Sequence, residues 1–229
     1  MSGTAVLSVR HLSCGYGTTP VCGPVTASVS PGEVLGIVGF NGAGKSTVVR
    51  TMIGRQPPLD GDCRFRGLLV DDRSAAFRAA VSCVFDEDAF FPSLTAAEHL
   101  ELVARGHGMR EPVEAVAREL DAFGITAVAD ALPTELSSGQ RRRLLLAAGF
   151  IRPADLLVLD EPEQRLDPVM RELLGGRIRD RAGDGGAVVV VTHAPALLLA
   201  TASTCLVIDD EVRCVPVADG AALISGTRT

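Results

Sequence analysis

The sequence predicts an α/β fold with a mainly parallel sheet, an antiparallel β subdomain at the N-terminus and an α-helical subdomain inserted at about 91–145. Apolar segments alternate with segments of helical spacing in the second half of the chain, which is typical of a parallel sheet. Near the N-terminus the polarity alternates residue by residue, and helical spacing dominates 94–131. The length of 229 residues fits a single domain, 1–229.

The individual elements follow from local patterns along the chain. Residues 6–10 and 25–29 alternate like half-buried strands, and 61–66 is expected to join them in an antiparallel sheet. Strands of the central sheet are continuous apolar runs because both of their faces are covered, and helices are delimited by capping and breaking residues. We expect such strands at 33–38, 81–85, 155–160, 187–192, 205–208 and 212–215, and helices at 45–52, 95–102, 112–123, 138–150, 168–181 and 195–202.

Composition and charge exclude several classes of function. Hydrophobic residues make up 47% of the chain and charged residues 22%, as in soluble α/β proteins. The net charge of −6 argues against a broad nucleic-acid surface, and we expect no nucleic-acid partner. Neither a signal peptide nor an apolar run of the ~18 residues that a membrane helix needs is present. The six cysteines form no C-x-x-C pair, so we expect reduced thiols and a cytoplasmic location.

A glycine-rich loop follows the strand at 33–38. GFNGAGKST, residues 39–47, fits the phosphate-binding pattern G-x-x-x-x-G-K-[ST] and contains the only lysine of the chain. A compact ammonium fits a narrow loop around a phosphate better than the planar fork of arginine, which makes Lys45 a binding and catalytic candidate. Ser46 would offer its hydroxyl to Mg²⁺. The residues expected to bind nucleotide here are Gly39, Asn41, Gly42, Gly44, Lys45, Ser46 and Thr47.

Two acids end the apolar strand at 155–160. Charged groups at the end of a buried strand are costly unless they serve an ion or a reaction. We expect Asp160 to hold Mg²⁺ through water. We expect Glu161, kept extended by Pro162, to act as the general base on an attacking water.

The helix at 138–150 opens with LSSGQ, residues 136–140, in which Ser137 or Ser138 would be the N-cap. Arg141, Arg142 and Arg143 then occupy the first turns, where cations oppose the helix dipole. Either an anion binds at this helix end or the arginines form a solvated basic face, and the sequence supports both interpretations.

In the order and spacing of these motifs, the chain resembles the ATP-binding cassette (ABC) family over nearly its whole length. By this resemblance 39–47 is the Walker A motif, 156–161 Walker B, 136–140 the signature and 166–167 the end of the D-loop. The resemblance implies that His193 is the switch histidine at the γ-phosphate and that Tyr16, the only tyrosine, stacks on adenine. It also implies nucleotide contacts for Ser137, Ser138, Gly139 and Gln140.

Two positions depart from the family pattern. Asp86 stands where a glutamine usually ligates Mg²⁺ and senses the membrane partner, and a carboxylate is still a suitable ligand, although with a shorter reach. Ser138 replaces the first glycine of the signature and adds a side chain where phosphate should dock.

The resemblance implies a Mg²⁺-dependent ATPase subunit that powers a membrane transporter from the inner face of the cell membrane. Two cassettes would meet head to tail, as a homo- or heterodimer, and drive integral membrane subunits. Two alternatives stay open, namely a soluble ABC ATPase without a membrane partner and a regulatory ATP-binding cassette with little turnover. The acidic residue at position 86 and the short C-terminal region favour export, and the transported substrate is not readable.

Overall fold

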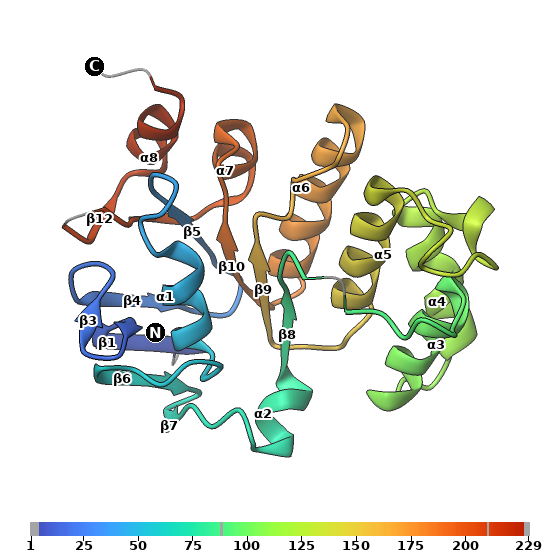
Figure 1. Ribbon diagram of the computed structural model, residues 1–229, viewed down its shortest axis with the longest axis horizontal. Helices are drawn as coiled ribbons and strands as arrows, with labels where there is room; N and C mark the ends of the chain where they lie inside the picture. Colours follow the sequence, from blue (N-terminus) through green and yellow to red (C-terminus); the bar gives the residue numbers. More distant parts are fainter. Residues whose placement is uncertain (1–4, 88, 210, 227–229) are drawn as a thin grey trace.

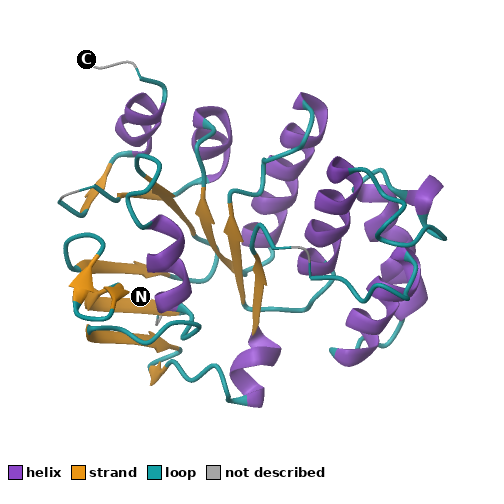
Figure 2. Ribbon diagram, viewed as in Figure 1, coloured by secondary structure: helices purple, strands orange, loops and turns teal. Residues whose placement is uncertain are grey.

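The computed structural model describes residues 5–87, 89–209 and 211–226, so the two ends of the predicted domain 1–229 lie outside it. An antiparallel sheet, a six-stranded central sheet and a group of helices follow one another across the molecule (Figure 1). Figure 2 shows that the strands gather on one side and that helices α3, α4 and α5 lie on the other. This arrangement confirms the predicted fold class.

The N-terminal sheet is antiparallel and has the strand order β4-β1-β6-β7. Val29 and Phe65 both pair with Leu7 in the central strand, and all three side chains are buried, so the alternating pattern fixes the register. The short strands β2, β3 and β7 were not predicted, because two residues carry no periodicity. The strands here are β1 (Leu7–Ser13), β2 (Gly15–Tyr16), β3 (Thr19–Pro20), β4 (Val25–Val29), β6 (Asp60–Phe65) and β7 (Leu68–Leu69).

The central sheet has the strand order β12-β11-β5-β10-β9-β8, and its neighbouring strands are parallel except β11 and β12. Strands β5, β9 and β10 are buried along their whole length, as their continuous apolar sequences predict. Their carboxyl ends therefore meet at one edge, where parallel sheets bind ligands. The strands are β5 (Val34–Val38), β8 (Val81–Val84), β9 (Leu156–Asp160), β10 (Ala187–Val191), β11 (Thr204–Val207) and β12 (Arg213–Val215).

The helices that accompany the central sheet agree with the sequence patterns. The predicted helices are α1 (Lys45–Met52), α5 (Ser138–Phe150), α6 (Pro168–Gly183) and α7 (Pro195–Thr201). The short helices α2 (Ala75–Ala80), η1 (Thr126–Val128, a 3₁₀ helix) and α8 (Val217–Ile224) were not predicted.

Helices α3 (Ala96–Gly106) and α4 (Pro112–Ala122) pack with α5 beside the edge strand β8 (Figure 1). A capping box between Thr95 and Glu98 begins α3. Phe123 is fully buried in the same apolar cluster as residues of β9, so the inserted helices share a core with the sheet. Glu119 of α4 also forms an ion pair of 2.5 Å with Arg177 of α6. The boundaries 91–145 of the inserted subdomain stay a prediction, and α5 itself continues to residue 150.

Two further features are the state of the cysteines and the length of the helices. All six cysteines are free thiols. Burial raises the pKa of Cys14 to about 11 and that of Cys63 to about 12, which keeps both thiols protonated and unreactive. Among the described residues, none of the helices is both long and apolar enough to span a bilayer.

Candidate nucleotide-binding site

The glycine-rich loop lies between the end of β5 and the start of α1. Gly42 and Gly44 have φ values of 83° and 89°, in the left-handed region that favours glycine. A Cβ atom at Gly39 would lie 2.0 Å from the carbonyl oxygen of Ile208, and one at Gly44 would lie 2.5 Å from Val21 Cγ2. Conformation and space therefore both require glycine in this loop, which fits the predicted phosphate cradle.

Lys45 is only 5% exposed and its ammonium lies inside the loop. Its Nζ atom donates hydrogen bonds to the carbonyl oxygens of Gly39 at 3.0 Å and Phe40 at 2.8 Å. Burial lowers the pKa of Lys45, while the charges of Glu161 and Asp160 oppose that shift. An anion in the loop would give this buried cation a counter-charge that carbonyl dipoles alone do not supply.

Asp160 ends β9 and is 6% exposed. Burial raises the pKa of its carboxyl, and the nearby Ser46 hydroxyl lowers it. Its Oδ1 atom has no hydrogen-bond partner among the described residues. A buried, unpartnered carboxylate oxygen beside a serine hydroxyl is a donor set that suits Mg²⁺, which is usually bound by one or two protein ligands plus phosphates and water. The described residues contain no group of three or more His, Cys, Asp or Glu side chains that could hold a metal ion.

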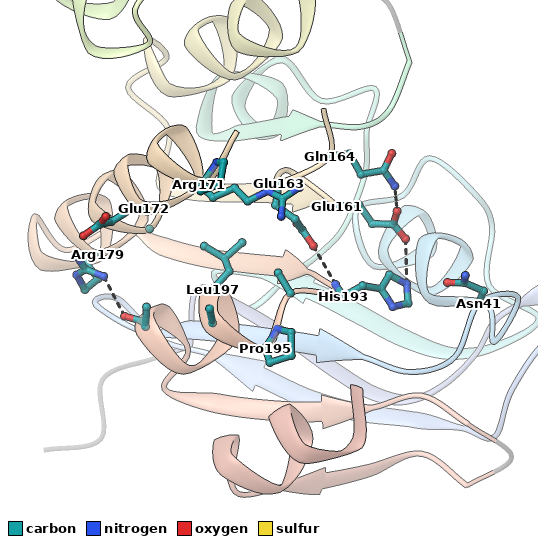
Figure 3. A pocket seen from close by; sticks show the side chains of 15 residues that line it. Asn41, Glu161, Glu163, Gln164, Arg171, Glu172, Arg179, His193, Pro195 and Leu197 are labelled. Atoms are coloured by element: carbon teal, nitrogen blue, oxygen red, sulfur yellow. Dashed lines mark hydrogen bonds and ion pairs between the residues drawn. The ribbon is translucent and has the colours of Figure 1, made fainter. Parts of the chain in front are cut away.

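Glu161 and His193 approach each other at the ends of β9 and β10 (Figure 3). His193 Nε2 lies 3.2 Å from Glu161 Oε1, within ion-pair distance, although the contact does not have hydrogen-bond geometry. Gln164 Nε2 donates a hydrogen bond to the other carboxylate oxygen. These three residues and Asn41 line one pocket of about 1050 Å³. The strand ends thus bring together an acid from Walker B, the predicted switch histidine and the phosphate-binding loop.

The prediction that the main chain of Glu161 is extended is wrong. Its φ is 47°, in the left-handed region, although Pro162 follows it. The main chain is held there from both sides, because the N–H of Glu161 donates to the carbonyl of Val191 at 2.9 Å and its carbonyl accepts from Arg142 Nη2 at 2.7 Å. Tertiary hydrogen bonds have overridden the local preference.

Asp86, the predicted metal ligand in place of glutamine, is engaged by arginines. Arg165 Nη2 donates to its two oxygens at 2.8 and 2.9 Å, and Arg142 Nη1 lies 3.9 Å from Oδ1. Asp86 would therefore have to exchange these cations for a metal ion. Its role as a ligand stays a prediction.

The signature segment begins α5 with a capping box. Ser137, rather than Ser138, is the N-cap: its Oγ accepts from the N–H of Gln140 at 3.3 Å, and Gln140 Oε1 accepts from the N–H of Ser137 at 2.8 Å. The side chains of Ser137 and Ser138 are exposed. In Figure 1, α5 lies on the side of α3 and α4, whereas α1 lies on the side of the N-terminal sheet. The signature therefore belongs to a different part of the surface from the phosphate-binding loop of the same chain.

Neither interpretation of the sequence, an anion site or a solvated basic face, describes all of the arginines that follow the signature. Arg142 is fully buried and donates to the carbonyl oxygens of Phe85, Asp160 and Glu161 at 2.9, 3.0 and 2.7 Å. Arg143 Nη2 lies 2.5 Å from Asp167 Oδ2. Arg142 thus links the segment after β8 to the end of β9 inside the protein. Nothing in the local sequence distinguishes it from the neighbouring arginines.

Tyr16 is 65% exposed, and its hydroxyl lies 3.2 Å from Thr47 Oγ1. It lines a pocket of about 640 Å³ together with Ser46, Thr47 and Arg50. An exposed ring anchored at the end of the phosphate-binding loop is suited to stacking on a base.

A buried lysine in a glycine loop, next to an acid pair at the strand ends, defines a P-loop nucleotide-binding protein. The family model for ABC transporters matches residues 22–164, and the chain belongs to this family. The predicted fold is thereby confirmed, as is the predicted class of protein, an ATP-hydrolysing subunit of a transporter.

Similar proteins cover most of the chain. The cytochrome c biogenesis ATP-binding export protein CcmA 2 of Cupriavidus metallidurans is 34% identical over 82% of this chain and 90% of its own length. The Nod factor export ATP-binding protein I of Rhizobium etli is 37% identical over 82% of this chain, which spans only 60% of that relative. A solved ATP-binding subunit of an ABC transporter covers 97% of the chain and 94% of its own length at 26% identity, with a TM-score of 0.83. A dimeric ATP-binding cassette with ADP and Pi has a TM-score of 0.82 at 22% identity, covers 92% of this chain and 98% of its own, and shows the same fold.

Proposed function

We propose that this chain is the Mg²⁺-dependent ATPase subunit of a membrane export system and that it acts as a head-to-tail dimer with a second cassette. The observation that carries the proposal is the convergence of Lys45, Asp160, Glu161 and His193 at the carboxyl ends of neighbouring parallel strands. The buried Lys45 and Asp160, beside the partly exposed Glu161 and His193, suit the binding of a triphosphate at such an edge. The names of the relatives, which are export proteins, support the direction of transport.

The residues divide the work by their chemistry. Lys45 and the loop amides hold the phosphates, and Tyr16 stacks on the base. Ser46 and Asp160, with Asp86 as a further candidate, hold Mg²⁺, which when bound neutralises phosphate charge. Glu161 accepts a proton from the attacking water, and His193 orients the γ-phosphate end of the site.

The second cassette completes the site in this proposal. Ser137 and Ser138 are exposed at the start of α5, on a part of the surface away from their own phosphate-binding loop. In a head-to-tail dimer these residues, with Gly139 and Gln140, contact the ATP held by the other subunit. A solved structure of the same fold is dimeric, which supports the pairing of two cassettes.

A membrane subunit is proposed to dock beside Asp86. Phe91 is 54% exposed there, and it lines a hollow of about 250 Å³ with Phe85 and Val103. An exposed aromatic ring at a partly apolar hollow suits a protein partner. With the chain bound to a membrane subunit in this way, we propose that it lies on the inner face of the cell membrane. Co-purification with a multi-span membrane protein tests this, and hydrolysis without any such partner would favour the soluble ABC ATPase instead.

The general base provides the main test. Glu161→Gln should bind ATP normally, hydrolyse it ~10²–10⁴-fold more slowly and accumulate as an ATP-bound dimer, detected by light scattering with Mg²⁺-ATP. Lys45→Ala should abolish that dimer. Glu172→Gln is the matched control, because Glu172 is an exposed acid that lines the same pocket from α6 and should leave hydrolysis unchanged.

Hydrolysis by Glu161→Gln at the wild-type rate would mean that the base lies elsewhere. If the wild-type chain neither hydrolyses ATP nor dimerises beside its membrane partner or a second cassette, the regulatory cassette is the correct alternative.

A further inference from the structure

Glu163 is a buried acid to which the mechanism above gives no role. It lies in the segment that connects β9 to α6, two residues after Glu161, and is 6% exposed. A carboxylate so far from water is costly unless donors or cations compensate it. The structure supplies both.

One oxygen of Glu163 holds the main chain where β10 ends. Oε1 accepts hydrogen bonds from Thr192 Oγ1 at 2.5 Å and from the N–H of His193 at 3.0 Å. The hydroxyl of Thr192, itself fully buried, accepts in turn from the N–H of Ala194 at 2.9 Å. Three consecutive residues at the end of β10 are thus linked to a single carboxylate oxygen.

The same histidine faces Glu161 with its ring. Figure 3 shows Glu163 at the main-chain nitrogen of His193 and Glu161 at the imidazole. Because His193 Nε2 is 3.2 Å from Glu161 Oε1, the place of the ring relative to this carboxylate depends on where the main chain of His193 is held. Glu161 therefore contacts the ring of His193, and Glu163 holds its main chain.

The charge of Glu163 acts separately on Arg142, to which neither of its oxygens is hydrogen-bonded. The guanidinium of Arg142 is fully buried, and burial lowers its pKa, while Asp86 and Glu163 favour the charged form. The charge of Glu163 and the position of its oxygen beside His193 can consequently be tested separately, because one substitution removes the charge and another moves the oxygen.

We propose that Glu163 is a positioning residue for ATP hydrolysis, which fixes the His193 ring beside Glu161 by holding the main chain of Thr192 and His193. The inference rests on the proposed roles of Glu161 and His193 in hydrolysis. Glu163 acts through His193 and not on the attacking water, since its Oε1 accepts from two donors and its Oε2 is buried away from solvent.

Three variants separate the effect of the side-chain length of Glu163 from the effect of its charge. Glu163→Gln keeps a carbonyl oxygen at the same distance from the main chain, Glu163→Asp keeps the charge but withdraws the oxygen by one methylene, and Glu163→Ala removes both. We expect kcat to fall about 10²-fold in Glu163→Asp and Glu163→Ala, the order of loss that a displacement of about 1 Å produces. Glu163→Gln should retain nearly wild-type kcat, and all three should bind ATP with wild-type affinity by calorimetry.

NMR of the imidazole groups reports the position of His193 without using activity. The chain has four histidines, and the signal of His193 is assigned as the one lost in His193→Ala. Glu163→Asp and Glu163→Ala should shift this signal and leave those of His11, His99 and His107 in place, whereas Glu163→Gln should not shift it. Unmoved signals of the other histidines show that each variant is folded.

Two results would overturn the inference. If Glu163→Asp behaves like the wild type while Glu163→Gln loses activity, Glu163 serves as the counter-ion of Arg142 instead. If the His193 signal stays in place in every variant, Glu163 does not position the ring. A wild-type chain that never hydrolyses ATP would refute the proposed function alone, because the NMR result still decides whether Glu163 holds His193.

Discussion

Replacing Arg142 by methionine should destabilise the protein substantially. Arg142 is fully buried, and it donates hydrogen bonds to the carbonyl oxygens of Phe85, Asp160 and Glu161. It thus ties the segment after β8 to the end of β9 from the first turns of α5. Methionine fills a similar volume but donates no hydrogen bond. The carbonyl groups of Phe85 and Asp160 therefore lose this donor, whereas that of Glu161 keeps the N–H of Gln164 at 3.2 Å.

The magnitude follows from the carbonyl groups of Phe85 and Asp160. Each buried acceptor left without a donor costs roughly 1–3 kcal/mol. Against this loss, the variant no longer buries a guanidinium, which recovers part of the energy because desolvating a charge is expensive. We expect a net loss of about 3 kcal/mol, which for a chain of this length lowers Tm by roughly 6–12 °C.

Thermal unfolding followed by circular dichroism measures this loss, and denaturation by urea gives the free energy independently. Arg118→Met is the matched control, because Arg118 is an exposed arginine on α4 and its replacement should change stability by no more than ~0.5 kcal/mol. A Tm of Arg142→Met within a degree or so of the wild-type value would refute the reasoning. It would mean that water or other donors satisfy the carbonyl groups of Phe85 and Asp160.

Three further predictions concern ligand binding. Lys45→Arg should lose most ATP affinity although the charge is kept, because a planar guanidinium does not fit between the carbonyl groups that hold the ammonium; unchanged affinity by calorimetric titration would contradict this. Asp86→Gln removes the charge that Arg165 binds and should keep Mg²⁺-ATP binding while altering the hydrolysis stimulated by the membrane partner; equal stimulation in both proteins would show that Asp86 does not affect coupling. Because burial raises the pKa of Asp160 and only its ionised form binds a cation, the affinity for Mg²⁺-ATP should fall as the pH drops through that raised pKa, earlier than for an exposed aspartate. Calorimetry over this pH range measures the dependence, and Asp160→Asn should flatten it.

The sequence alone determined the main elements of the fold and the loop that holds Lys45. Continuous apolar runs predict buried strands, and the positive φ values of the glycines at 39, 42 and 44 belong to one local turn. These signals are local because they depend on residues within a few positions of each other. Elements too short to show a period, such as β7 and α2, gave no such signal.

Tertiary structure alone decided which side chains act on the predicted site. Arg142 finds its acceptor at Phe85, 57 residues away, and Arg165 finds Asp86, 79 residues away. Glu163 reaches His193 across 30 positions. The neighbouring sequence does not show whether such a side chain is buried and hydrogen-bonded or exposed to solvent. A distant segment of the chain provides both the burial and the partner. Desolvation strengthens the partnerships of the buried Arg142 and Glu163, and it exists only once the strands and helices have packed.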